Sequence, residues 1–258
     1  MTELAIANKS FLTRAVTFVA AQGVAQFLDI GAGLPTPPLA GRDMQPLWQP
    51  THEAARSVAP EAMVAYVDSD PHPVRHSAAM LASGDPRLVA VRGDLTEPEA
   101  IIADPRIRAA GLNPRRPVCV VLGCVLHFVP PEQARATVAT LMRALAPGSH
   151  VVISVGYDGE TGSFAEDYNA QRGPRVYRQT RASIDALFTG LAVVPPGVVD
   201  AATWRAGGAS CPRVAMIMAG VGRILLYETD PPASPASPFS GQVRPAAGYS
   251  AARGRAPG

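Results

Sequence analysis

Five short apolar segments, separated by stretches of helical composition, constrain the fold of this chain more than any other feature. Each segment is apolar almost throughout rather than alternating between apolar and polar residues. Continuous apolar runs are typical of parallel strands that helices cover on both faces. The alternation of strand and helix therefore predicts an α/β fold with a parallel sheet. The predicted strands are Gln26–Ile30, Met63–Val67, Leu88–Val91, Val118–Val125 and His150–Val155.

Segments with helical character lie before, between and after these strands. Asn8–Gln22 places apolar residues at helical spacing and is followed by Gly23, which is typical of a helix end. Crossover helices are expected at Pro73–Ser83 and Pro131–Ala146, and a further helix at Arg181–Phe188. These helices would cover both faces of the sheet.

Two later apolar stretches are expected to form an antiparallel pair at the sheet edge. They are Leu191–Val199 and Val214–Ala219, and the loop between them contains Gly207 and Gly208. The predicted fold is therefore a Rossmann-like, doubly wound sheet that is mostly parallel and has an antiparallel edge pair.

The distribution of proline separates one folded domain from two irregular stretches. Residues 231–258 are dominated by Pro, Ala, Gly and Ser, a composition typical of disorder. Residues 35–50 hold five prolines and are interpreted as an insertion after the first strand. We expect a single domain over residues 1–230, interrupted by this insertion and followed by a disordered tail.

Composition and charge argue against several classes of protein. The net charge is only +2, and no basic stripe interleaved with aromatic residues is visible, which argues against a nucleic-acid partner. No segment resembles a signal peptide, and the longest apolar run is too short to span a bilayer. Three cysteines without a paired pattern favour a reducing compartment. We therefore expect a cytoplasmic protein with no membrane partner, and the histidine spacing indicates no metal site.

The turn after the first predicted strand is the most informative local motif. In the sequence FLDIGAG, the strand carries Asp29 near its end and runs into Gly31 and Gly33. Glycines allow a sharp turn and a close approach of a ligand to the backbone. A purely structural tight turn is the alternative interpretation of the same glycines.

Acidic residues also follow the second and third predicted strands. Asp68 is placed to accept hydrogen bonds from both hydroxyls of a ribose, whereas Asp70, before a proline, could cap the next helix. Asp94 could accept a hydrogen bond from an adenine amine, and Leu95 could pack on the base. The alternative is that Asp68 and Asp70 serve only to form the turn.

The glycine turn discriminates between two adenosine-containing ligands. A pyrophosphate-binding loop normally has a third glycine, but Thr36 occupies that position here. Asp29 would repel phosphate, yet it suits a cationic group such as an amino-acid ammonium. The pattern therefore favours S-adenosylmethionine over NAD.

Several motifs in the same order resemble a family of actinobacterial S-adenosylmethionine-dependent methyltransferases, the SAM-methyltransferase 19 type, once classed as a domain of unknown function. The resemblance extends from about Asn8 to Arg223. The motifs are NKSFLTRAV, FLDIGAGLPT, THEAA, YVDSDP, GDL and VLHFVP.

The resemblance implies a class I methyltransferase fold and a set of cofactor-binding positions. Asp29, Gly31 and Gly33 would lie at the methionine end, Asp68 at the ribose and Asp94 near the adenine. The remaining predicted cofactor-binding residues are Ser69, Leu95 and Gly123.

Two departures from the family pattern concern activity. Family members usually begin with a further segment containing a Gly-Gly-Lys-Asn-like motif, which is expected to help close over the cofactor, and this sequence starts just after it. The stretch Leu39–Pro50 looks inserted beside the glycine loop and could obstruct or reshape it.

A histidine after the fourth strand is the candidate catalytic residue. His127 would lie on the acceptor side and could remove a proton from the acceptor. The preferred alternative is that His127 packs or hydrogen-bonds at the strand end, because many methyl transfers need only proximity and orientation.

The sequence thus predicts an S-adenosylmethionine-dependent methyltransferase that acts on a small-molecule acceptor. The alternative is a catalytically silent homologue that binds the cofactor or a partner and lacks the N-terminal cofactor lid. A nicotinamide-dependent oxidoreductase is disfavoured by the missing third glycine.

Overall fold

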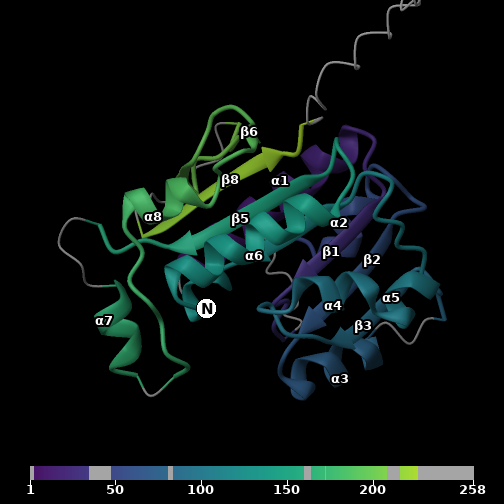
Figure 1. The fold of residues 1–258 in the computed structure, drawn as a ribbon, viewed down its shortest axis with the longest axis horizontal. Helices are drawn as coiled ribbons and strands as arrows, with labels where there is room; N and C mark the ends of the chain where they lie inside the picture. The colour runs from purple at the N-terminus through teal and green to yellow at the C-terminus, as the bar shows by residue number, and fades with distance from the viewer. Residues whose placement is uncertain are drawn as a thin grey trace, which may run out of the picture. The chain divides into compact units, whose positions relative to one another are not determined.

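An eight-stranded sheet forms the centre of the fold (Figure 1). The computed structural model describes residues 3–34, 48–80, 84–159, 164–171, 173–207 and 216–225. The strand order is β3-β2-β1-β4-β5-β8-β6, and β7 also pairs with β8. The strands are β1 (Gln26–Ile30), β2 (Met63–Asp68), β3 (Leu88–Arg92), β4 (Cys119–Gly123), β5 (His150–Gly156), β6 (Ala192–Val193), β7 (Val199–Asp200) and β8 (Ile217–Arg223).

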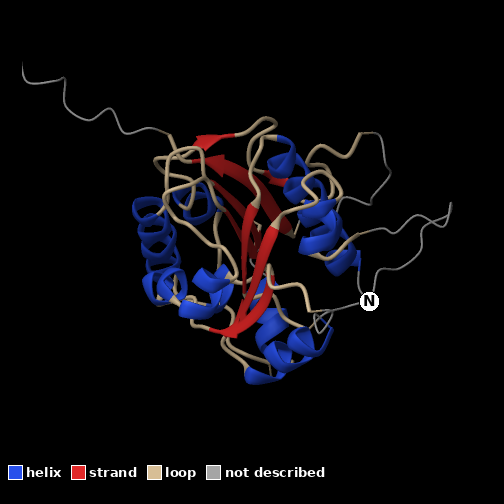
Figure 2. Cartoon of the chain, turned by 90° about the vertical axis from the view of Figure 1, so that its right-hand side faces the viewer, coloured by secondary structure: helices blue, strands red, loops and turns tan. Residues whose placement is uncertain are grey.

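Helices cover both faces of this sheet, as Figure 2 shows with the strands in red between helices in blue. Strand side chains alternate between two apolar clusters. Phe27 of β1 packs in the cluster that includes α1 and α2, whereas Leu28 packs in the cluster that includes α4, α5 and α6. The helices are α1 (Glu3–Ala21), α2 (Thr51–Arg56), α3 (Pro71–Met80), α4 (Pro98–Ala103), α5 (Pro105–Ala109), α6 (Pro131–Ala144), α7 (Phe164–Asn169) and α8 (Arg181–Ala186), with a short 3-10 helix at Leu126–Phe128.

The longest of these helices, α1, has an amphipathic pattern. Its buried side chains include Phe11, Ala15 and Val19, which recur at helical spacing. Within the part of the chain that the structure describes, no helix is both long enough and apolar enough to cross a membrane. The apolar side of α1 packs against one face of the sheet.

The predicted parallel core of the sheet is confirmed. β1 pairs in parallel with β2 on one side and with β4 on the other, and β2–β3 and β4–β5 are parallel as well. The fourth strand is shorter than expected because it ends at Gly123. The next residue, Cys124, has a φ of 53° and donates its backbone N–H to Ser154 O at 2.9 Å. A left-handed residue cannot continue a strand.

The antiparallel edge is present, but it is built differently from the expected pair. β8 pairs antiparallel with β5, and the stretch Leu191–Val199 contributes only the two-residue strands β6 and the start of β7, both paired with β8. Pro195 and Pro196 interrupt this stretch. Proline has no backbone N–H for a ladder, so an uninterrupted strand could not form there.

An insertion is expected at residues 35–50 and a disordered tail at residues 231–258. Residues 35–47 and 231–258 lie outside the described residues. The helix predicted at Pro73–Ser83 is confirmed as far as Met80 and starts two residues earlier, at Pro71, while residues 81–83 lie outside the described residues. The short helices α2, α4, α5 and α7 were not predicted, because none exceeds six residues and periodicity is a weak signal over so few positions.

Candidate functional site

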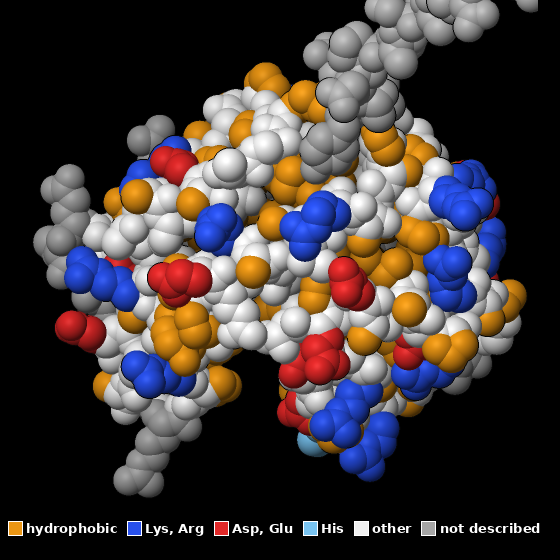
Figure 3. All heavy atoms as spheres, in the orientation of Figure 1, with side chains coloured by type: hydrophobic (Ala, Val, Ile, Leu, Met, Phe, Trp, Pro, Cys, Tyr) orange, Lys and Arg blue, Asp and Glu red, His pale blue; other side chains and the backbone are white. Residues whose placement is uncertain are grey.

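The carboxyl ends of the parallel strands meet at one edge of the sheet, and the predicted site residues follow these ends. The register aligns Asp29 of β1 with Tyr66 of β2, and Asp68 of β2 with Arg92 of β3. Figure 3 shows a hollow in the surface at this edge, with α7 on one side and α3 on the other. Acidic side chains gather on the α3 side of the hollow. In open α/β sheets, ligands bind outside the carboxyl ends of the strands.

The two glycines of the turn have different surroundings. Both adopt a left-handed conformation, with φ of 72° at Gly31 and 63° at Gly33. A Cβ at Gly31 would lie 2.7 Å from the Cβ of Val125, so a side chain there would collide with the segment after β4. A Cβ at Gly33 would meet no atom of the described residues within 4 Å. Gly31 is therefore required by packing, while Gly33 faces open space that a ligand can enter.

Asp68 connects the end of β2 to this turn. Its Oδ2 accepts a hydrogen bond from the backbone N–H of Gly33 at 2.9 Å, and its Oδ1 accepts one from the N–H of Asp70 at 3.0 Å. Each carboxylate oxygen has more than one lone-pair site, so Asp68 retains acceptor capacity for a further ligand. Asp70 accepts from the N–H of His72 at 2.8 Å and caps α3, as its position before Pro71 indicated.

The residues at the end of β3 occupy two different environments. Asp94 is exposed, and its Oδ1 accepts hydrogen bonds from the N–H and the hydroxyl of Thr96, both at 2.8 Å. Leu95 is only 8% exposed and belongs to the apolar core, so its side chain presents little surface to a ligand. Ser69, beside Asp68, is exposed, and its carbonyl accepts from Arg92 Nε at 3.0 Å.

Two further predicted residues lie at the end of β4. A Cβ at Gly123 would lie 2.7 Å from Leu12 Cδ1, so the glycine admits α1 close to the strand. His127 is 3% exposed, and its Nδ1 accepts a hydrogen bond from the N–H of Gly156 at 3.1 Å. Burial lowers the pKa of His127 to about 4, against the opposing effect of the Asp158 carboxylate. The ring is therefore neutral at pH 7 and serves as an acceptor inside the fold.

Asp29 is a buried carboxylate beside the glycine turn. It is 8% exposed, and its Oδ2 accepts a 2.6 Å hydrogen bond from the hydroxyl of Thr51. Burial raises the pKa of Asp29 to about 6, opposed by the Thr51 hydrogen bond and the Lys9 ammonium, and the charge of Asp68 acts in the same direction as burial. Desolvation disfavours the charged form of an acid, so a bound cation would relieve this cost.

Sequence reasoning missed the roles of Thr51 and Lys9. Both lie in segments that carry the family resemblance, but neither residue type by itself indicates a site. Thr51 is the first residue of α2, and its partner Asp29 is 22 positions away, a pairing that only the fold brings about. The one available signal for Lys9 was that it is the sole lysine of the chain.

The strand order and the glycine turn flanked by Asp29 and Asp68 define a class I S-adenosylmethionine-dependent methyltransferase fold. Comparison with known families agrees: the chain belongs to the S-adenosyl methyltransferase family Methyltransf_19, whose family model matches residues 1–225. S-adenosylmethionine is therefore its cofactor. The position of the acidic residues at the strand ends fits this ligand, which has an ammonium and a ribose but no phosphate.

Solved structures support this assignment. A protein from Thermobifida fusca YX, assigned as a methyltransferase, is 34% identical with a TM-score of 0.74, covering 86% of this chain and 82% of that chain. A DUF574 family protein from Streptomyces avermitilis is also 34% identical, with a TM-score of 0.71 and coverage of 84% and 82%. An O-methyltransferase family protein from Burkholderia thailandensis, 14% identical with a TM-score of 0.53, covers 83% of this chain and 55% of that chain and shares the fold. No curated protein matches the chain.

The two glycines of the turn should differ in their tolerance of alanine. Gly33→Ala is expected to lower the free energy of unfolding by about 1 kcal/mol, the cost of a left-handed alanine. Gly31→Ala adds a collision with Val125 and should cost about 3 kcal/mol. Urea denaturation measures both values. Equal losses for the two variants would contradict the different surroundings of the two positions.

The pH dependence of stability should report the buried Asp29. Because its pKa is higher in the folded state than in the unfolded chain, the folded protein binds more protons between pH 4 and 6, and stability falls as pH rises through this window. Asp29→Asn removes this penalty and should be the more stable protein at pH 8, by about 2 kcal/mol, with little difference at pH 4. Urea unfolding at several pH values measures the difference.

A matched variant tests whether the effect belongs to the Asp29 carboxylate. Thr51→Val removes a hydrogen bond that favours the charged carboxylate, so it should raise the pKa of Asp29 and extend the fall in stability to higher pH. Identical pH profiles for the wild type and Asp29→Asn would show that another group causes the dependence.

Proposed function

We propose that this chain transfers the methyl group of S-adenosylmethionine to a small-molecule acceptor bound in the hollow beside α7. The observation that carries the proposal is the open space at Gly33 beside the carboxylate of Asp68, 2.9 Å from the glycine N–H. When bound, S-adenosylmethionine supplies a methyl group on a positively charged sulfur. The protein's part is to bind, orient and exclude water around the reacting groups.

Each carboxylate has a distinct binding role in this proposal. Asp68 accepts hydrogen bonds from the ribose hydroxyls, for which its lone pairs remain available. Asp29 pairs with the ammonium of the amino-acid end, which offsets the cost of burying its charge. Asp94, exposed at the end of β3, accepts from the adenine amine. The chain thus binds the cofactor through three carboxylates along one sheet edge.

An aromatic group on the α7 side supports the assignment of the acceptor site. Phe128, Phe164 and Tyr168 are all partly exposed, and Tyr168 lies 6.0 Å from Phe128 and 6.3 Å from Phe164 between ring centroids. Aromatic rings offer large apolar contact area with defined geometry. This wall would suit a small acceptor with an apolar or planar part.

His127 acts in this proposal as a positioning residue. Its Nδ1 holds the N–H of Gly156 at the end of β5, and its ring lies 4.6 Å from Phe128 and 5.7 Å from Phe164. The histidine thus joins the end of β5 to the aromatic wall. Methyl transfer then proceeds through proximity and in-line orientation rather than through proton removal by this ring.

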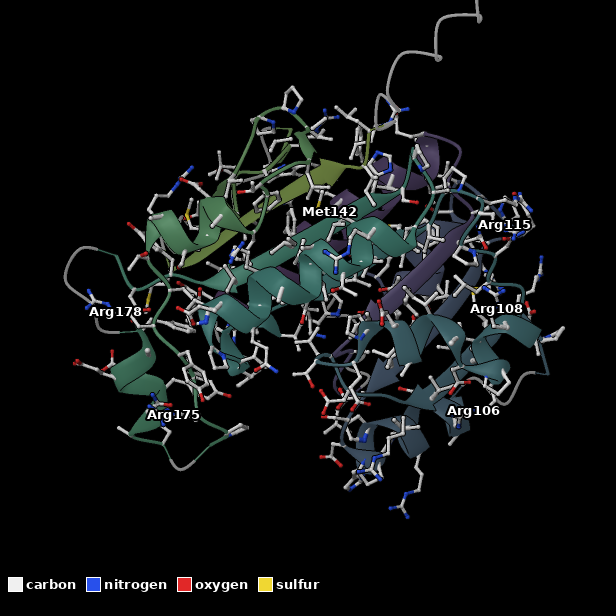
Figure 4. The ribbon with its side chains drawn as sticks, in the orientation of Figure 1. Arg106, Arg108, Arg115, Met142, Arg175 and Arg178 are labelled. Carbon is white, nitrogen blue, oxygen red and sulfur yellow. The ribbon has the colours of Figure 1, made fainter. Side chains whose placement is uncertain are left out.

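The low net charge of +2 favours a small molecule over nucleic acid as the acceptor. In Figure 4, Arg106, Arg108 and Arg115 lie on the α5 side, whereas Arg175 and Arg178 lie on the opposite side beside α7. A nucleic-acid groove would need such residues in one continuous stripe.

Calorimetric titration with S-adenosylhomocysteine and, separately, with NADH tests the cofactor assignment. Binding of S-adenosylhomocysteine alone supports the proposal, and binding of NADH alone would overturn it. Incubation with methyl-labelled cofactor and a metabolite library then tests turnover. Tight cofactor binding with no labelled product from any fraction would support a silent cofactor-binding homologue instead.

Two neighbouring acids provide a matched test of the ribose site. Asp68→Ala should weaken S-adenosylhomocysteine binding about 10- to 100-fold, the usual range for losing hydrogen bonds to a charged group. Asp70→Ala should leave the affinity unchanged and lower stability by about 1 kcal/mol, because Asp70 caps α3. Calorimetry and urea denaturation measure the two quantities. Equal affinities for Asp68→Ala and the wild type would remove Asp68 from the site.

A further inference from the structure

Lys9 is a partly buried cation that pairs with no carboxylate of the described residues. It lies on α1, and its ammonium is 5.9 Å from the ring centroid of Trp48, a cation–π distance. Among the described residues, Lys9 makes no ion pair within 4.0 Å. Burial lowers the pKa of Lys9, while the nearby Asp29 carboxylate raises it. A partly desolvated, unpaired ammonium is costly unless it has a ligand.

The position of Lys9 is fixed from both sides. On one side, Asn8 Oδ1 accepts a 2.6 Å hydrogen bond from Ser154 Oγ, near the carboxyl end of β5. On the other side, Thr13 Oγ1 accepts one from the N–H of Gln49 at 2.8 Å, next to Trp48. These bonds hold this part of α1 against the same sheet edge that carries the glycine turn. Lys9 thus lies on α1 between two residues whose side chains are hydrogen-bonded to other segments of the fold.

The ring beneath the ammonium also carries an unused donor. Trp48 is 2% exposed, and its indole Nε1–H has no hydrogen-bond partner among the described residues. Buried donors are normally satisfied, so an unpaired one beside an unpaired cation indicates a missing acceptor. An anionic oxygen of a ligand would pair with the Lys9 ammonium.

An amino-acid group carries one positive and one negative charge on the same carbon. Asp29 matches the positive ammonium of such a ligand. The negative carboxylate of the ligand would be repelled by Asp29 unless a protein cation lay nearby, and the charge of Lys9 interacts with that of Asp29. Lys9 is such a cation. The pair Asp29 and Lys9 therefore matches both charges of a free amino-acid end.

We propose that Lys9 binds the carboxylate of the methionine part of S-adenosylmethionine. Trp48 holds the Lys9 ammonium in place. The inference rests on the proposed function, because it assigns a residue to the same cofactor. It makes Lys9 the recognition residue for the amino-acid end, so the chain distinguishes the intact cofactor from analogues that lack the carboxylate.

The test compares two ligands that differ only in that carboxylate. Calorimetry at pH 8 measures the affinities for S-adenosylhomocysteine and for its decarboxylated analogue, which keeps the amine. The wild type should bind S-adenosylhomocysteine more tightly. Lys9→Met should weaken this binding about 10- to 100-fold and leave the analogue's affinity unchanged, whereas Lys9→Arg should retain most of the preference. Arg75→Met, an exposed cation on α3, is the control and should change neither affinity.

Three outcomes would overturn the inference. Unchanged S-adenosylhomocysteine affinity in Lys9→Met would remove Lys9 from the site. An equal loss for both ligands would show that Lys9 supports the fold of the site rather than the carboxylate, and urea denaturation of the variant would show the same defect. Failure of the wild type to bind either ligand would instead overturn the proposed function itself.

Discussion

The pairing of β1 with both β2 and β4 is the constraint on which the rest of the structure depends. β1 is buried along its whole length, and each of its neighbours runs parallel to it. The chain reverses its direction of winding at this strand, since β2 and β3 lie on one side and β4 and β5 on the other. Ligands of such sheets bind at this point. The turn at Gly31 therefore opens where the two halves of the sheet separate, and Asp29 and Asp68 reach it from adjacent strands.

This arrangement lowers the stability of the free protein because it buries charged side chains. Asp29 lies in the interior with a hydroxyl from Thr51 as its hydrogen-bond donor, and Lys9 lies partly buried without an ion pair among the described residues. In a structure without ligand, each charge is only partly compensated. A ligand with both an ammonium and a carboxylate would compensate the two at once, so in the proposed function the same residues that lower the stability of the free protein supply the affinity for the ligand.

The parallel core of this structure and the positions of the acidic residues at one sheet edge could be predicted from the sequence, because both follow from local patterns. Continuous apolar runs fixed the strands, and the acid at the end of each run lies at the same edge in any parallel sheet. The edge strands were harder, since Pro195 and Pro196 reduce an apolar stretch to a short pair. Leu95 and Thr51 show a different limit. Packing between segments far apart in the chain decides that Leu95 faces the core rather than a ligand. Such packing also brings Thr51 to Asp29.

The antiparallel strand β8 completes the sheet late in the chain. β5 lies between β4 and β8, and β8 also holds β6 and β7, so residues 217–223 supply the backbone partners for three strands. Without this segment, β5 would have an open edge with unpaired N–H and C=O groups beside its apolar side chains. Open edges of this kind readily pair with other chains. β8 therefore does more than extend the sheet, because it also covers an edge of β5 that would otherwise be open to pairing with another chain.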